Sequence, residues 1–379
     1  MGIYLDNAAT TPIRPEVAQV MFDAMQQDYG NPSSVHQYGR HANHELLTAR
    51  GQIAKSINAQ EKEIIFTSSG SEGDNLAILK SVEVQSGKGK HIITSAIEHP
   101  AVLKTMQYLE KIGYDVTYLP VDEKGQITLE QVKKSLKTDT IFVSLMYGNN
   151  EVGTIFPIVE IAHYLRERNI LFHTDAVQAY GVEDIDVQQL GVDLLTVAAH
   201  KINGPKGIGF LYVRSGVPLQ ALIHGGEQER NLRAGTENLP AIMGFARAIE
   251  FLTPAEKKVK RQMFSEYRKL ILDALQDADI EYHINGDPNS YLPLILSLAI
   301  PNIDSNLLLM RLDLLGYAVS IGSACTAGNI HKSHVLTAIY GEHHPYVEST
   351  VRLSFGYQTT KEEVVSFASD FVQIIQELS

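Results

Sequence analysis

Short apolar runs alternate with amphipathic stretches of helical spacing through the first two thirds of the chain. The apolar runs predict buried β-strands at residues 63–67, 91–95, 140–146, 170–174, 193–198 and 207–213. The stretches between them predict helices at residues 74–84, 101–112, 129–136 and 158–167. Strands that alternate with helices predict an α/β fold around a mainly parallel sheet. Ligands of such sheets collect at the carboxyl ends of the strands.

The pattern changes near Pro254. A long charged stretch at 255–275 has helical spacing and predicts a solvated helix that joins two domains. Beyond it the chain mixes predicted strands and helices, at residues 294–300, 306–315, 351–355 and 361–378. This mixture indicates a second, smaller α+β domain.

Composition narrows the classes of function. The chain has 379 residues and a net charge of −12, which argues against direct binding of nucleic acid. Its one cysteine excludes an internal disulfide framework and fits a reducing cytoplasm. We see no signal-like start and no apolar run near the roughly 20 residues that cross a bilayer. We therefore expect a cytoplasmic protein without a membrane contact.

That cysteine, Cys325, lies in a run of small residues at 320–328, Ser-Ile-Gly-Ser-Ala-Cys-Thr-Ala-Gly. A cysteine in a core normally has bulky apolar neighbours, and this one has none in its immediate sequence. The glycines leave the backbone permissive, so a reachable, reactive thiol is one interpretation. An inert buried cysteine is the other. The cysteine alone does not separate them.

A Ser/Gly turn follows the first predicted strand, at residues 67–73. Backbone N–H groups at the start of the next helix, together with the hydroxyls of Ser69 and Ser71, could bind a phosphate. Ser69 and Glu72 also have the spacing of a capping box, which needs no ligand. Both interpretations stay open.

Two later strand ends carry charged residues. Asp175 follows the strand at 170–174, where its partner would be a protonated heteroaromatic nitrogen, an arginine or a backbone N–H. Lys201 follows the strand at 193–198 and precedes a Gly/Pro turn, where an amine can form a Schiff base; Lys206 better fits a surface lysine. An acid and a lysine on neighbouring strand ends match the pairing used around pyridoxal phosphate.

With these residues assembled, the chain resembles the cysteine desulfurases of the NifS/IscS type, pyridoxal-phosphate enzymes of the class V aminotransferase family. The resemblance runs nearly end to end. Its landmarks are Tyr4–Pro12, Gly30–His36, Glu98–Val102, Asn149–Gly153, Asp175–Gln178, His200–Lys201, Gly204–Gly207, Arg233–Asn238, Gly322–Thr326 and Val351–Ser354.

The resemblance implies a fold type I architecture and a homodimer with its active site near the interface. It implies a large cofactor domain at 16–253 and a small domain formed by 1–15 and 254–379. The small domain would carry the cysteine loop at about 320–332. The implied cofactor is pyridoxal 5′-phosphate.

The resemblance also implies a role for each matching residue. At the cofactor ring, Lys201 would form the Schiff base, Asp175 would pair with the ring nitrogen, His99 would stack on the ring and Gln178 would donate to the phenolic oxygen. Around the phosphate, the expected residues are Gly70, Ser71, His200 and, from the neighbouring subunit, Thr236. Asn150 would lie at the edge of substrate and cofactor, and Arg352 would clamp the substrate carboxylate through a bidentate contact.

The implied reaction converts L-cysteine to L-alanine. Lys201 removes the Cα proton, His99 serves as acid and base, and Cys325 attacks the substrate sulfur and keeps it as a persulfide. The sulfur would pass to an acceptor protein, either an iron–sulfur scaffold or a tRNA-thiolating enzyme. A selenocysteine lyase, a class V aminotransferase and a non-enzymatic scaffold are the competing functions.

Two residues depart from the family's pattern. Ser71 replaces the usual threonine of the phosphate cup and keeps the hydroxyl, whereas Ala198 replaces a serine and loses it. The loss of one neutral hydrogen bond, about 1 kcal/mol, is expected to weaken cofactor retention without abolishing it.

A group of histidines follows the cysteine. Its members are His331, His334, His343 and His344. We expect no metal site there, because the turn at 341–345 has the composition of a solvated loop. A simpler role is that His331 or His334 tunes the thiolate fraction of Cys325.

Overall fold

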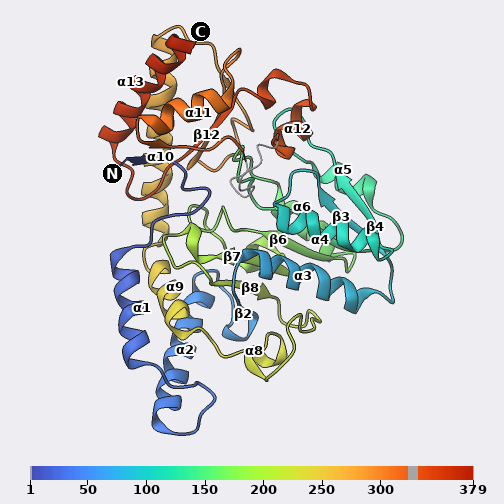
Figure 1. Ribbon diagram of the computed structural model, residues 1–379. Helices are drawn as coiled ribbons and strands as arrows, with labels where there is room; N and C mark the ends of the chain where they lie inside the picture. The colour runs from blue at the N-terminus through green and yellow to red at the C-terminus, as the bar shows by residue number, and fades with distance from the viewer. Residues whose placement is uncertain (1, 323–331, 379) are drawn as a thin grey trace.

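A seven-stranded sheet forms the centre of the protein in the computed structural model, which describes residues 2–322 and 332–378 (Figure 1). Its strand order is β2-β8-β7-β6-β5-β3-β4. The strands are β2 (Ile64–Thr67), β3 (His91–Ser95), β4 (Asp115–Leu119), β5 (Thr140–Ser144), β6 (Leu171–Asp175), β7 (Leu194–Ala198) and β8 (Gly209–Val213). Neighbouring strands are parallel except at β8, which runs antiparallel to both β2 and β7. The predicted α/β fold with a mainly parallel sheet is confirmed.

The apolar strands are continuous in sequence because both faces of the sheet are covered. In β2, Ile65 faces a cluster formed with α3 and α4, whereas Ile64 and Phe66 face the larger cluster on the opposite side. Helices connect the strands. They are α3 (Gly70–Gln85), α4 (Pro100–Lys111), α5 (Leu129–Ser135), α6 (Ile158–Arg166) and α7 (Val187–Leu190).

A group of helices from distant parts of the chain packs together beside this sheet (Figure 1). They are α1 (Pro15–Gln27), α2 (Gln37–Lys55) and α9 (Leu239–Ile249). The short α8 (Gln228–Asn231) precedes α9, and single 3₁₀ turns are η1 (Glu61–Glu63), η2 (Ala199–Lys201) and η3 (Pro345–Val347). The apolar pattern did not predict α1, α2 or α9. All three lie outside the part of the sequence in which strands and helices alternate, because α1 and α2 precede β2 and α9 follows β8.

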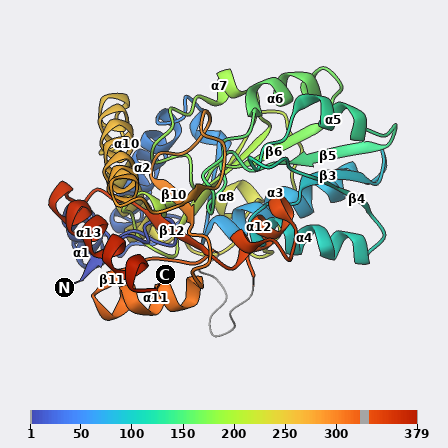
Figure 2. The ribbon, with the colours of Figure 1, turned by 90° about the horizontal axis from the view of Figure 1, so that it is seen from above.

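The C-terminal part contains a three-stranded antiparallel sheet in the order β12-β10-β9. Its strands are β9 (His283–Ile284), β10 (Ile295–Ala299) and β12 (Thr350–Ser354), and its helices are α10 (Pro254–Asp277), α11 (Ser305–Leu314), α12 (His334–Tyr340) and α13 (Lys361–Leu378). The N-terminal strand β1 (Ile3–Tyr4) pairs with β11 (Tyr317–Ala318), so the start of the chain lies against its last third (Figure 2).

Several predicted boundaries need correction. The pattern missed β4, an edge strand whose residues are mostly only partly buried. It began α3 at Asp74, whereas the Ser69 cap starts the helix at Gly70. It also described α10 as solvated. That helix in fact buries one face, which includes Phe264 and Ile271 and also the charged Lys257 and Arg268. No helix within residues 2–322 and 332–378 is long and apolar enough to span a membrane.

Candidate active site

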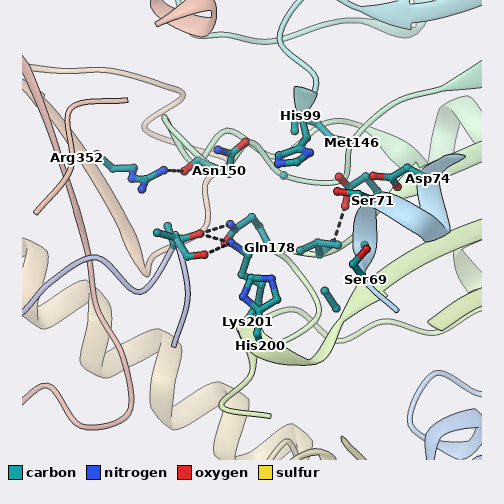
Figure 3. A pocket seen from close by; sticks show the side chains of 17 residues that line it. Ser69, Ser71, Asp74, His99, Met146, Asn150, Gln178, His200, Lys201 and Arg352 are labelled. Carbon is teal, nitrogen blue, oxygen red and sulfur yellow. Dashed lines mark hydrogen bonds between the residues drawn. The ribbon is translucent and has the colours of Figure 1, made fainter. Parts of the chain in front are cut away.

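One pocket collects residues from the carboxyl ends of five strands (Figure 3). Its walls include the start of α3 after β2, the start of α4 after β3, and the segments that follow β5, β6 and β7. Nine of the residues expected at the site line it, namely Gly70, Ser71, His99, Asn150, Asp175, Gln178, His200, Lys201 and Arg352. Thr236 does not line it and is exposed, and Cys325 lies outside the described residues.

Lys201 ends η2, directly after β7, and its side chain reaches into the pocket. Its Nζ donates hydrogen bonds to the carbonyl oxygens of Ala8 at 2.5 Å and Ala9 at 2.8 Å. The N-terminal segment therefore fixes the amine at the wall of the pocket. Gln178 lies beside it, since its Nε2 donates to the same Ala8 oxygen at 2.8 Å (Figure 3).

Asp175 is the last residue of β6 and is only 7% exposed. Burial raises the pKa of its carboxyl to about 6, against the opposing effects of a hydrogen bond from the Val177 N–H and the charge of Lys201. The Val177 N–H donates to Oδ1 at 2.9 Å, so one of the two structural alternatives, a backbone cap, is present. The same side chain lines the pocket, where a cationic ring nitrogen would lower its pKa again.

His99 caps α4, and its Nδ1 accepts a hydrogen bond from the Ala101 N–H at 3.1 Å. Burial lowers its pKa to about 4, helped by the charges of Lys201 and His334. The imidazole is therefore neutral near pH 7, and its proton is on Nε2 because Nδ1 is an acceptor. His200 is also neutral, because burial and the charge of Lys201 lower its pKa to about 4.

The turn before α3 has a partial capping box. The Glu72 N–H donates to Ser69 Oγ at 3.1 Å, which is the expected cap. The Glu72 carboxylate accepts a hydrogen bond from the Ser68 N–H at 2.8 Å, whereas a full capping box would have it accept from the Ser69 N–H. Ser71 is exposed at the pocket wall, so its hydroxyl is better placed for a ligand than that of Ser69. Ala198 also lines this wall, as the departure from the family pattern implied.

Arg352 enters the pocket from β12 and is 1% exposed. One guanidinium nitrogen donates to the Asn150 carbonyl oxygen at 2.9 Å (Figure 3). Another donates to Asp6 Oδ1 at 2.8 Å. Its buried Nε has no partner among the described residues. An unpaired donor on a buried cation at the pocket wall suits a small carboxylate ligand.

Sequence reasoning missed three buried groups near Asp175. Asp74 lines the pocket, Glu98 is fully buried before His99, and His173 lies two residues before Asp175 on the same strand. His173 Nδ1 hydrogen-bonds Ser144 and Nε2 hydrogen-bonds Thr196. Burial lowers the pKa of His173 to about 3, whereas burial and the charge of Asp175 raise that of Asp74. The period-two spacing of His173 and Asp175 on one strand was a signal that could have found His173.

The burial of Glu98 predicts that the stability of the fold depends on pH. Burial raises its pKa to about 8, although hydrogen bonds from Ser95 and the Met146 N–H oppose the shift. The ordinary pKa is 4.5. Protonated Glu98 therefore contributes fully to the free energy of unfolding below pH 4.5. This contribution is lost as the pH rises toward 8. Relative to Glu98→Gln, the wild type should lose about 1.4 kcal/mol of unfolding free energy per pH unit.

Urea unfolding of both proteins between about pH 5 and 8 measures this difference. Glu110→Gln, at an exposed position of α4, is the control and should show no comparable trend. A wild-type minus Glu98→Gln difference that stays constant over this range would contradict the buried protonated carboxyl.

The histidines after the cysteine do not form a metal centre in the described chain. No group of three or more His, Cys, Asp or Glu side chains in residues 2–322 and 332–378 could hold a metal ion. His334 Nε2 instead hydrogen-bonds the Glu98 carbonyl oxygen at 2.9 Å, and His344 stacks on Tyr340. His343 is exposed in a turn, and His331 lies outside the described residues.

The chain matches a known family over almost its whole length. The family model described as aminotransferase class-V matches residues 3–367. The chain belongs to the class-V aminotransferase family. The predicted resemblance is thereby confirmed. The cofactor of this class-V chain is pyridoxal 5′-phosphate.

Relatives of this class-V chain match from end to end. The Bacillus subtilis (strain 168) protein IscS 1 is 48% identical over 377 residues, covering 100% of this chain and 99% of its own length. A protein of Dictyoglomus turgidum named cysteine desulfurase IscS is 43% identical, covering 99% of this chain and 95% of its own.

Solved structures agree with this placement. A NifS-like protein superposes with a TM-score of 0.92 at 36% identity, with full coverage of both chains. A structure described as SspA in complex with cysteine has a TM-score of 0.82 at 35% identity, covering 93% of this chain and 98% of that one.

The pocket residues of this class-V chain fit the cofactor. The carboxylate of Asp175, the amine of Lys201 and the neutral imidazole of His99 line one cavity. The N-terminus of α3, with the exposed Ser71, forms another wall of it. Gly70 lets the helix start lie close to the segment after β6, because a Cβ there would lie only 3.0 Å from Val177 Cγ2. The donor set therefore suits an anionic phosphate joined to a cationic aromatic ring.

Proposed function

We propose that the protein is a pyridoxal 5′-phosphate-dependent cysteine desulfurase that converts L-cysteine to L-alanine and keeps the sulfur as a persulfide on Cys325. The observation that carries the proposal is the meeting of Lys201 and Asp175 in one pocket at adjacent strand ends. Relatives that are named cysteine desulfurase and match over the full length support the choice of substrate.

Lys201 would hold the cofactor through Nζ, in the position that its bonds to Ala8 and Ala9 define. When bound, pyridoxal 5′-phosphate supplies an aldehyde that captures amines and a ring that accepts electrons from the substrate's Cα. Asp175 would keep the ring nitrogen protonated, and Gln178 would donate to the phenolic oxygen. Asn150 would contact the substrate and cofactor edge, and His99 would stack on the ring.

The phosphate would be held by the start of α3. Gly70 and Ser71 belong to that turn, and His200 lies at the facing wall of the pocket. Thr236 is exposed on the subunit surface and away from this pocket, which supports its assignment to the partner's site.

Arg352 would bind the carboxylate of L-cysteine. Asp6 and Asn150 hold two of its nitrogens, so the guanidinium has a fixed direction before the substrate arrives. Lys201, once released by the substrate, would take the proton from Cα. His99 would serve as acid and base in the later proton transfers through Nε2, since Nδ1 already accepts a hydrogen bond from Ala101.

Cys325 would then receive the sulfur. Its thiolate attacks the sulfur of L-cysteine, the carbon–sulfur bond breaks, and the electron pair of that bond goes to the carbon that becomes the methyl group of alanine. Protonation of this carbon and return of a proton to Cα complete L-alanine, and the new sulfur–sulfur bond remains on the enzyme. No external oxidant is needed, because the carbon that receives this electron pair is reduced while the two sulfurs are oxidised to the persulfide level.

We propose the domain division 16–253, and 1–15 with 254–379. The pairing of β1 with β11 and the bridge from Asp6 to Ser354 support the inclusion of the N-terminus in the small domain. We also propose a cytoplasmic homodimer that passes sulfur to an iron–sulfur scaffold or a tRNA-thiolating enzyme. Exposed apolar side chains on and between α1 and α2 support an interface. They are Phe22, Met25, Tyr29, Val35 and Tyr38.

The products formed from L-cysteine test the proposal. A desulfurase yields L-alanine and enzyme-bound sulfur in equal amounts, whereas an aminotransferase yields a keto acid. Amino-acid analysis and keto-acid assay of the same reaction separate the two. Selenocysteine as a competing substrate tests the lyase alternative. An inert protein with bound cofactor would favour the scaffold.

A further inference from the structure

A strained segment leads to Thr236. Three consecutive residues of α8, Glu229, Arg230 and Asn231, have positive φ angles of 46°, 58° and 64°. Residues other than glycine visit this left-handed region singly, because Cβ crowds the following carbonyl oxygen. Strain of this kind persists only where the surrounding contacts impose it, and it is concentrated at functional sites.

Glu229 anchors this turn to β2. It is 6% exposed and accepts two hydrogen bonds from Arg50, at 2.6 and 2.8 Å, and a third from the Phe66 N–H at 2.9 Å. Arg50 also donates to the Ile64 carbonyl oxygen and lies over the Phe66 ring. The carboxylate is thus attached to β2, and loss of its charge would leave a buried guanidinium without a counterion.

A second contact ties the segment to the turn after β2. Arg233 Nε donates to Glu72 Oε1 at 2.9 Å, and the other oxygen of Glu72 accepts from the Ser68 N–H at 2.8 Å. These bonds connect α8 and its following residues with the same turn that contains Ser71. Figure 1 shows α8 beside β2 at the lower edge of the sheet.

We propose that Glu229 is a positioning residue that sets the place of Thr236 by anchoring the strained turn to β2. This inference rests on the proposed function, in which Thr236 binds the cofactor phosphate in the partner subunit's site. It adds a physical link between the two sites of the dimer. Strand β2 leads into the phosphate turn of its own subunit's site, and it also fixes Thr236, which would bind the phosphate in the partner subunit's site. Glu229 itself does not line the pocket and would act only through Thr236.

Release of pyridoxal 5′-phosphate from the holoenzyme tests this link. The release rate is followed by absorbance after dilution, for the wild type, Glu229→Gln, Thr236→Ala and the double variant. Loss of one charge-assisted phosphate contact is expected to speed release about tenfold in Thr236→Ala. Glu229→Gln should give a similar increase. The release rate of the double variant should stay within about twofold of the rate of Thr236→Ala, because both changes act on the same contact.

Asn231→Gly is the matched control in the same turn. Glycine adopts the left-handed conformation without strain, so release should stay within about twofold of the wild type. If Glu229→Gln does not fold, Arg233→Gln replaces it in the cycle, because that contact is less buried.

The release rates distinguish the phosphate role of Thr236 from the positioning role of Glu229. A wild-type release rate in Thr236→Ala would remove the proposed phosphate role of Thr236. A fast Thr236→Ala combined with a wild-type rate in Glu229→Gln, or with effects that multiply in the double variant, would overturn the positioning role alone. The ³¹P resonance of the bound cofactor gives a readout independent of activity, and it should shift in the same variants.

Discussion

Replacing Lys201 with alanine is expected to lower the rate of alanine formation from L-cysteine by at least about 10³-fold. The variant should also lose the visible absorbance of a lysine-bound cofactor. The reason is positional. In the wild type, the bonds to Ala8 and Ala9 place the Lys201 amine at the pocket wall. Absorbance spectra and amino-acid analysis of the products measure both effects.

Lys206 provides the matched control. It is an exposed lysine in the same Gly/Pro turn and does not line the pocket. Lys206→Ala should therefore keep the rate within about twofold, in line with a surface charge. Retention of the lysine-bound absorbance in Lys201→Ala, or its loss in Lys206→Ala, would assign the cofactor to a different amine and remove the basis of the proposed function.

Cys325→Ser is expected to bind the cofactor normally and to lose sulfur transfer by at least about 10³-fold. Serine keeps the size of the side chain but lacks the nucleophilic thiolate. Because the chain has one cysteine, any sulfur found on the protein by mass spectrometry after reaction with L-cysteine is assigned without ambiguity. The wild type should carry the added sulfur and the variant should not.

The two variants stop the reaction at different stages. With L-cysteine, Cys325→Ser should still change the cofactor spectrum, because Lys201 and Arg352 are intact. Lys201→Ala should not pass through the same spectral change. Persistent sulfide release by Cys325→Ser at the wild-type rate would show that another group accepts the sulfur.

Local sequence pattern predicted the central strands and most of the helices between them, because strands buried on both faces are continuous apolar runs. It failed at β4, where an edge position leaves polar and apolar residues mixed. It also failed to describe α10, whose lysines and arginines suggested a solvated helix while Phe264 and Ile271 lie in the core. Composition records how many charges a helix has, whereas packing decides which face is covered.

The candidate site shows the same division. Asp175 and Lys201 could be found as charged residues at the ends of apolar strands, since the carboxyl ends of parallel strands share one edge. Asp74 and Glu98 could not. Their chemistry comes from complete burial beside Asp175, and desolvation depends on every segment that packs around them.

The amino-acid order by itself determined the alternation of strands and helices, the family, and the residues that stand at the strand ends. Tertiary structure decided what those residues contact: Ala8 and Ala9 reach Lys201 from the other end of the sequence, Asp6 reaches Arg352, and Arg50 reaches Glu229. These contacts join positions more than a hundred residues apart. Periodicity reports only neighbours within a few residues, so such pairs arise only when the whole chain has folded.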